Sequence, residues 1–148
     1  MVTRARDPGP FVREIEHTAD AGAVVRGGTL PRLFENASRA MFDLICDRRA
    51  VRPLRSVRIA VQGSSLEDLL VRWLSELLYL LETEDMLFTS FTLARVDRTL
   101  FRARGSARGE RIDRSRHRLR RELKAVTYHQ IEVVRGRSAW RVRLVFDV

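Results

Sequence analysis

A chain of 148 residues with 45% hydrophobic and 32% charged residues can bury one core, which argues against a disordered protein and against a disulfide-stapled miniprotein. The net charge of +9 is carried almost entirely by arginine, and a field of this sign attracts nucleic acid or an acidic protein surface. The charges are nevertheless spread along the chain rather than gathered in one block, as on the solvated surface of any arginine-rich protein.

No run of residues is long and apolar enough to span a membrane, and residues 1–10 lack the apolar core of a signal peptide. We therefore expect a cytoplasmic protein with a disordered tail over residues 1–10 and one domain over residues 11–148. A single cysteine, Cys46, excludes an intramolecular disulfide. Because it lies near the end of an apolar helical pattern, we expect a buried, inert thiol rather than a nucleophile.

The N-terminal half of the domain predicts short strands and two amphipathic helices. Residues 11–16 and 21–26 are expected to form strands, and the second of these ends at two glycines. The first helix follows, with Thr29 as its N-cap and a proline in its first turn. Residues 57–61 alternate apolar and polar, which is typical of a half-buried strand.

The second helix is the clearest element of the sequence. Ser64 and Ser65 each have an acidic residue three positions later, the arrangement of a capping box. An apolar stripe then runs to about Glu82 and indicates that a sheet covers one broad face of the helix.

The rest of the chain predicts mainly β-structure. Residues 88–96 and 99–105 form a candidate hairpin around Asp97-Arg98, and a second hairpin turns at residues 135–138. Between them lie an irregular, arginine-rich stretch over 108–121 and a short strand or connector over 123–128. Two helices with about seven short strands predict an α+β fold, a single compact domain whose helices pack on one side of a mainly antiparallel sheet.

Most sequence signatures of enzymes are absent. There is no glycine-rich phosphate loop, Cys-x-x-Cys, His-Glu-x-x-His or Gly-x-Ser-x-Gly motif, and the only histidines are His17, His117 and His129. Asp113 and His117 are four residues apart and could share one helical turn, a spacing more typical of a solvated face than of a site. These observations argue against nucleophilic or zinc-dependent catalysis.

Two aspartates lie where predicted strands end. Asp20 follows the first strand, and Asp147 precedes the last residue, Val148. If the last strand lies near the first, both carboxylates and the terminal carboxylate of Val148 would converge as hard oxygen donors that suit Ca²⁺, Mg²⁺ or Mn²⁺. In the alternative, Asp20 caps a turn and Asp147 pairs with an arginine such as Arg141 or Arg143.

A second polar group lies in an otherwise apolar segment and consists of Lys124, Thr127, Tyr128 and His129. Lys124 could hold a carboxylate or a phosphate as a point charge. His129 could transfer protons or orient a neighbouring group.

Four strings of this sequence, in their order and spacing, resemble the archease family. They are residues 16–20 (EHTAD), 66–80 (LEDLLVRWLSELLYL), 123–129 (LKAVTYH) and 147–148 (DV). The likeness covers residues 11–148. It implies a compact α+β protein related to strand–helix–strand–strand modules that is not an enzyme itself.

The resemblance also implies a partner, an RtcB-type RNA ligase that joins 3′-phosphate or cyclic phosphate ends to 5′-hydroxyl ends in tRNA splicing and RNA repair. Archeases promote the GTP-dependent guanylylation of that ligase and its repeated turnover. By the resemblance, Asp20, Asp147 and the terminal carboxylate of Val148 are metal ligands, with Ca²⁺ the expected ion and Mg²⁺ or Mn²⁺ the alternatives. Lys124 matches the position needed for ligase activation, whereas His17 and His129 match motif positions without an assigned role.

The chain departs from the family pattern in three respects. Ala21 stands where a larger aliphatic residue is more usual, residues 118–121 are more basic, and archeases are commonly acidic whereas this chain is +9. The docking surface is therefore expected to match a particular ligase, or RNA contributes weak or indirect contacts.

Other functions remain open from the residues alone. One is a chaperone-like modulator of a tRNA cytosine methyltransferase or a basic RNA-binding module, although aromatics are only 7% and do not alternate with basic residues as stacking platforms do. Another is a metal-dependent hydrolase, for which His17 and Asp20 are the candidate pair.

Overall fold

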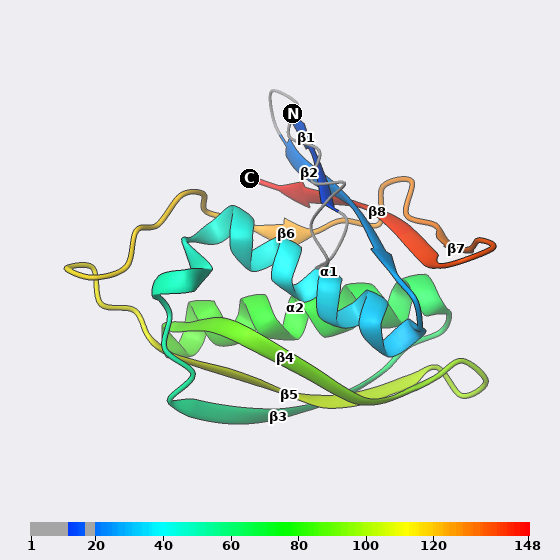
Figure 1. The fold of residues 1–148 in the computed structure, drawn as a ribbon, viewed down its shortest axis with the longest axis horizontal. Helices are drawn as coiled ribbons and strands as arrows, with labels where there is room; N and C mark the ends of the chain where they lie inside the picture. The colour runs from blue at the N-terminus through cyan, green and yellow to red at the C-terminus, as the bar shows by residue number, and fades with distance from the viewer. Residues whose placement is uncertain (1–11, 17–19) are drawn as a thin grey trace.

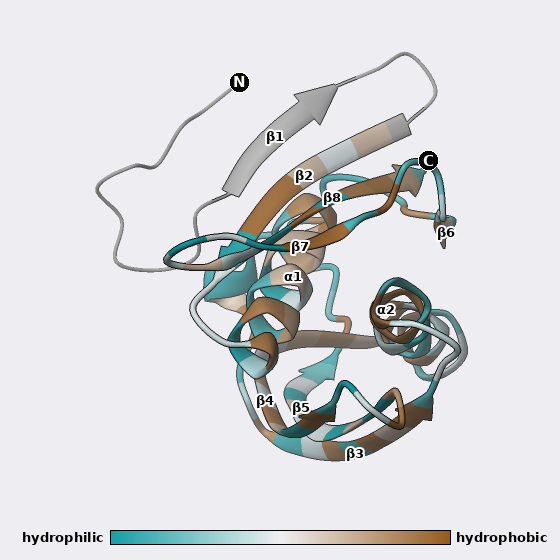
Figure 2. Cartoon of the chain, turned by 90° about the vertical axis from the view of Figure 1, so that its right-hand side faces the viewer, coloured by the Kyte–Doolittle hydropathy of each residue, from teal (hydrophilic) through white to brown (hydrophobic). Residues whose placement is uncertain are grey.

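The computed structural model describes residues 12–16 and 20–148, in which two helices lie between two antiparallel sheets (Figures 1 and 2). The first sheet has the order β1-β2-β8-β6, and β7 also pairs with β8. Its strands are β1 (Val12–Glu16), β2 (Asp20–Gly27), β6 (Ala125–Val126), β7 (Val133–Arg135) and β8 (Trp140–Asp147). The second sheet has the order β3-β5-β4, with β3 (Arg55–Gln62), β4 (Met86–Asp97) and β5 (Arg102–Arg111). The helices are α1 (Leu30–Ile45) and α2 (Leu66–Glu84), and Arg48–Ala50 forms a single 3₁₀ turn.

The predicted α+β fold with two helices packed on antiparallel β-structure is confirmed, but the strands divide into two sheets. The reason lies in α1, in which eleven of the sixteen residues are buried. A helix covered on only one side presents an apolar stripe, whereas α1 contacts β2 of the first sheet and β4 of the second. No helix in the described part of the chain is long and apolar enough to cross a membrane.

Both helices begin at the caps that the sequence predicts. The hydroxyl of Thr29 accepts a hydrogen bond from the backbone N–H of Arg32 at 3.2 Å, and Ser65 does the same for the N–H of Asp68 at 3.0 Å. Each contact satisfies a backbone donor that the first helical turn leaves unpaired. Helix α2 ends at Asp85, which adopts the left-handed conformation with φ of 54°.

Buried polar side chains connect the layers. The indole N–H of Trp73 in α2 donates to the hydroxyl of Ser38 in α1 at 2.9 Å, and that hydroxyl donates to the carbonyl of Phe34 at 2.7 Å. The side-chain amide of Asn36 donates to the carbonyl of Arg26 in β2 at 2.8 Å. Because buried polar groups are costly when unpaired, these contacts fix how α1 sits on α2 and on β2.

Two irregularities curve the second sheet. The pairing of β4 with β5 shifts between Phe88 and Ser90 and again between Leu93 and Arg95. The β5 residues opposite these shifts are Gly109 and Gly105. A Cβ atom on Gly109 would lie 1.8 Å from the carbonyl oxygen of Leu87, so only glycine allows the two backbones to approach this closely.

The β4–β5 connection differs from the predicted tight turn at Asp97-Arg98. Strand β4 continues through Asp97, and the turn spans residues 98–101. The carboxylate of Asp97 accepts the backbone N–H groups of Thr99 and Leu100 at 2.8 and 2.9 Å, which stabilises a longer turn. Strand β5 also runs on to Arg111, so the first part of the arginine-rich stretch is a strand rather than an irregular segment.

We expect the substitution Gly109→Ala to destabilise the protein by about 3 kcal/mol, because the added methyl group overlaps backbone atoms that belong to a packed sheet. Gly28→Ala is the matched control, since a Cβ there meets open space, and it should change stability by less than about 1 kcal/mol. Urea unfolding of the three proteins measures both effects. Equal unfolding midpoints for the two variants would contradict the inference that the close approach of β4 and β5 at Gly109 requires glycine.

Candidate functional site

Asp147 lies where three strands of the first sheet meet. In the register of the sheet, Asp147 of β8 is directly opposite Asp20 of β2 on one side and Ala125 of β6 on the other. The backbone N–H of Lys124 donates to the carbonyl oxygen of Asp147 at 2.7 Å. Residues from the start, the last third and the end of the chain therefore share one edge of the sheet, which we call the carboxylate edge.

The charged side chains described at the carboxylate edge are open to solvent. Asp147 and Lys124 are exposed, whereas Val148 is half-buried and packs against the core. Among the described residues, Asp147 forms no ion pair with Arg141 or Arg143, the two arginines that the alternative named as examples. The turn-capping alternative for Asp20 concerns a side chain outside the described ones.

The segment after β6 is held at both ends. The backbone N–H and the hydroxyl of Thr127 both donate to the carbonyl of Val145 in β8, at 3.0 and 2.9 Å. One residue later, the phenol of Tyr128 donates to the carboxylate of Asp68 at 2.6 Å. The segment is thus attached to β8 through Thr127 and to the first turn of α2 through Tyr128.

Asp68 is the centre of this attachment. Besides the Tyr128 phenol, its carboxylate accepts the backbone N–H of Ser64 at 2.8 Å and the guanidinium of Arg72 at 2.9 Å. The Tyr128 hydrogen bond, followed by that from Ser64, holds the pKa of Asp68 well below its usual range. The same bond raises the pKa of the Tyr128 phenol. The sequence analysis identified Asp68 only as a capping residue. Asp68 and Tyr128 nevertheless lie in two of the strings that resemble the archease family, residues 66–80 and 123–129.

The other candidate residues contribute less. His17 lies outside the described residues. His129 is exposed in the turn after β6, and its backbone N–H donates to the hydroxyl of Thr127 at 3.3 Å. Cys46 is fully buried, which confirms the predicted buried thiol, and burial raises the pKa of this thiol to about 11, so the reactive thiolate is disfavoured.

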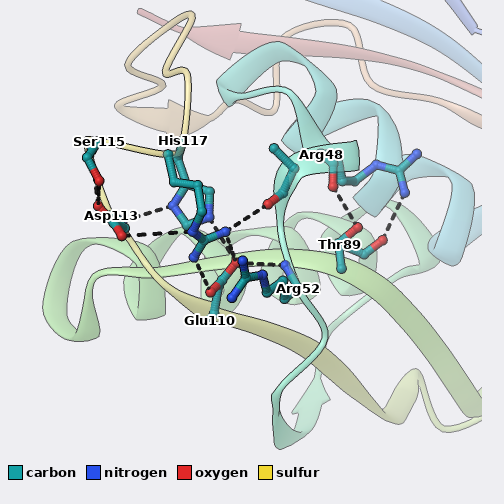
Figure 3. A network of polar contacts seen from close by, with 9 residues as sticks. Arg48, Arg52, Thr89, Glu110, Asp113, Ser115 and His117 are labelled. Carbon is teal, nitrogen blue, oxygen red and sulfur yellow. Dashed lines mark hydrogen bonds and ion pairs between the residues drawn. The ribbon is translucent and has the colours of Figure 1, made fainter.

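Away from the edge, a buried histidine and a glutamate form the network in Figure 3. One oxygen of Glu110 accepts from the backbone N–H of Arg52 at 2.7 Å and lies 2.9 Å from Nε2 of His117. The guanidinium of Arg116 bonds both carboxylate oxygens, at 2.6 and 3.0 Å, and lowers the pKa of Glu110 to about 2. The prediction that Asp113 and His117 form a solvated face is wrong for His117, because Glu110 draws the ring into the interior.

This network is structural. Nδ1 of His117 accepts the backbone N–H of Asp113 at 2.9 Å, so Nε2 carries the proton and donates it to Glu110. Both ring nitrogens are therefore occupied, and the side chain is only 1% exposed. A general base needs a free nitrogen within reach of a substrate, whereas this ring fastens residues 113–117 to the end of β5.

Fold and edge together define a small α+β protein, in which two sheets enclose two helices and a polar edge forms where β2, β6 and β8 meet. The family model of the archease protein family (MTH1598/TM1083) matches residues 13–148. The archease of Methanopyrus kandleri is 41% identical over 136 residues, 91% of this chain and 97% of that protein. The archease of Pyrococcus furiosus is 38% identical over 137 residues, 90% of this chain and 95% of that protein.

A solved structure agrees with these sequence matches. The solution structure of Methanobacterium thermoautotrophicum protein 1598 matches with a TM-score of 0.78 at 30% identity, and the match covers 93% of this chain and 98% of that one. The chain belongs to the archease family, as its four sequence strings indicated.

We expect Tyr128→Phe to destabilise the protein by about 1–2 kcal/mol at neutral pH, because it removes a hydrogen bond to an ionised carboxylate. The folded pKa of Asp68 is depressed, so its contribution is complete above the ordinary carboxyl range and is lost as pH falls through the folded value. The difference between wild type and variant should therefore shrink in acid. Thermal unfolding from neutral to acidic pH measures it, and a difference independent of pH would contradict the role of Asp68.

Proposed function

We propose that this chain is an accessory protein of an RtcB-type RNA ligase and activates that ligase through the carboxylate edge. The observation that carries the proposal is the register of β8, which places Asp147 opposite Asp20 and bonds its carbonyl to the backbone of Lys124. These are the residues that the resemblance to the archease family marks for metal binding and ligase activation. The exposure of Asp147 and Lys124 suits docking onto another protein.

The donor chemistry of the edge fits a hard divalent cation. Residues directly opposite in an antiparallel pair project to the same face, so the carboxylates of Asp20 and Asp147 are expected to converge. With the terminal carboxylate of Val148, they would offer oxygen ligands alone, which favours Ca²⁺ and admits Mg²⁺ or Mn²⁺. The described side chains contain no group of three or more His, Cys, Asp or Glu residues placed to hold a metal, and the site proposed here includes Asp20, whose side chain is not among them. When bound, the ion would supply positive charge for phosphate or carboxylate oxygens of the ligase complex.

Lys124 supplies a second positive charge beside the edge. The chain has 28 lysine and arginine residues, and Lys124 is the only lysine among them. An ammonium group is a compact point charge with three donors, whereas a guanidinium is broad, planar and directional. Because every other strongly basic residue of the chain is arginine, the lysine at position 124 supports a requirement for an ammonium group there. This ammonium would neutralise phosphate charge at the nucleotide site of the ligase.

Removing either aspartate carboxylate should abolish metal binding and activation together. We expect Asp20→Asn and Asp147→Asn to lower Ca²⁺ affinity in calorimetric titrations at least about tenfold and to lower multiple-turnover ligation by the ligase of the same organism in parallel. Asp85→Asn is the matched control, because that exposed aspartate caps α2 in a left-handed conformation that asparagine also adopts readily.

If both variants still stimulated the ligase, the ligase would remain the partner, but the carboxylate edge would not be the site of activation. No stimulation by the wild-type protein, whatever the nucleotide or metal, would overturn the proposal and favour the tRNA methyltransferase helper.

Lys124→Arg separates charge from shape. We expect it to lower ligase stimulation about tenfold, equivalent to roughly 1.4 kcal/mol of lost interaction, because the guanidinium cannot occupy the place of the ammonium. Ca²⁺ affinity should stay close to that of the wild type, since the carboxylates are unchanged. Lys124→Gln is the comparison. If Lys124→Arg were fully active and Lys124→Gln inactive, only the charge at this position would matter.

A further inference from the structure

The outer face of the β3–β5–β4 sheet carries arginines in register. Along β5, the small residues Ala103 and Ala107 are buried against the helical layer, so the alternate positions face outward. The exposed arginines of this face are Arg58, Arg95, Arg102, Arg104 and Arg108. We call this set the arginine face.

Most cations of the arginine face have no anionic partner among the described residues. The exception is Arg95, which pairs with Asp97 at 3.1 Å. Asp97 is itself engaged by backbone N–H groups of the following turn. The guanidinium groups of Arg58, Arg102 and Arg104 form no hydrogen bond or ion pair in the described part of the chain. The face therefore holds uncompensated positive charge.

Two open hollows adjoin each other across the arginine face. One has a volume of about 510 Å³ and is lined in part by Arg95, Arg102 and Arg104. The other has a volume of about 460 Å³ and is lined in part by Arg58, Arg104 and Ser106. Ala60 and Arg104 line both hollows, so the two lie side by side over the sheet, and we call them together the track.

The spacing and chemistry of this track suit a chain of phosphates. Same-face residues along a strand are about 7 Å apart, and neighbouring strands about 5 Å apart, so the backbone positions that carry these arginines are regularly spaced. The hydroxyls of Ser106 and Thr92, opposite each other in β5 and β4, add neutral donors of the kind that contact phosphate oxygens. The outward residues of the three strands include no aromatic side chain on which a base could stack.

We propose that the arginine face binds the phosphodiester backbone of an RNA strand without reading its sequence. The arginine charges favour contact with a phosphodiester backbone, whereas the identification of that polymer as RNA rests on the proposed function. The face lies on the far side of the helical layer from β2 and β8 (Figure 1). The protein can therefore hold RNA at one surface while the carboxylate edge engages a protein partner.

The test compares two double variants of equal net charge. Arg102→Gln with Arg104→Gln removes two cations from the centre of the arginine face. Arg141→Gln with Arg143→Gln removes two exposed arginines with the same two-residue spacing from β8 of the other sheet. Fluorescence anisotropy measures the binding of a short single-stranded RNA across a range of salt concentrations, and matching thermal unfolding shows that both variants fold.

Loss of the two face arginines should weaken RNA binding about tenfold or more and lower the slope of log affinity against log salt by about 1.4, roughly 0.7 for each phosphate contact on a single strand. The β8 variant should bind nearly as the wild type does. Equal weakening in both variants would show attraction by net charge alone and overturn the proposal.

Two further results would also overturn it. One is RNA binding that neither variant weakens. The other is binding of polyglutamate, but not RNA, that depends on Arg102 and Arg104, since this would assign the face to an acidic protein. The assay contains no ligase. Failure of RNA binding and failure of ligase activation are therefore separate results.

Discussion

The register of β8 is the constraint on which the rest of the structure depends. Its inward residues Val142, Leu144 and Phe146 are buried under the helices, and its two edges pair with β2 on one side and with β6 and β7 on the other. A shift of one residue would expose these three apolar side chains and turn Asp147 toward the core. Burying an unpaired carboxylate costs much free energy, so this shifted register is strongly disfavoured. The packing of three apolar side chains thus fixes the geometry of the polar edge at the end of the strand.

Local sequence patterns were sufficient to predict features in which a residue contacts its own neighbours along the chain. The caps Thr29 and Ser65 are properties of a few consecutive residues, and both were found as predicted. The condition for bringing Asp20 near Asp147 was that the last strand lies near the first; β8 instead pairs with β2, whose first residue is Asp20, opposite Asp147 in the register. Convergence of the two carboxylates stays a prediction. Their role as metal ligands stays a prediction.

Features that depend on distant partners could not be read from the sequence. Tyr128 and Asp68 are 60 positions apart, and burial of His117 depends on Glu110, which the sequence alone would leave in an exposed arginine-rich stretch. The division into two sheets likewise depends on both faces of α1 being covered. Nothing in a stripe of apolar residues says how many layers will pack against it.

The lone lysine has a practical consequence for finding what touches the edge. Arginine keeps its proton at any ordinary pH and does not react with amine reagents, whereas an exposed ammonium exchanges its proton and becomes a nucleophile. Among all side chains of this protein, only Lys124 offers such an amine. An amine-directed cross-linker would therefore attach at the chain's α-amino group and at this single place, beside Asp147. The natural sequence already carries a site-specific chemical handle at the surface where a partner is expected.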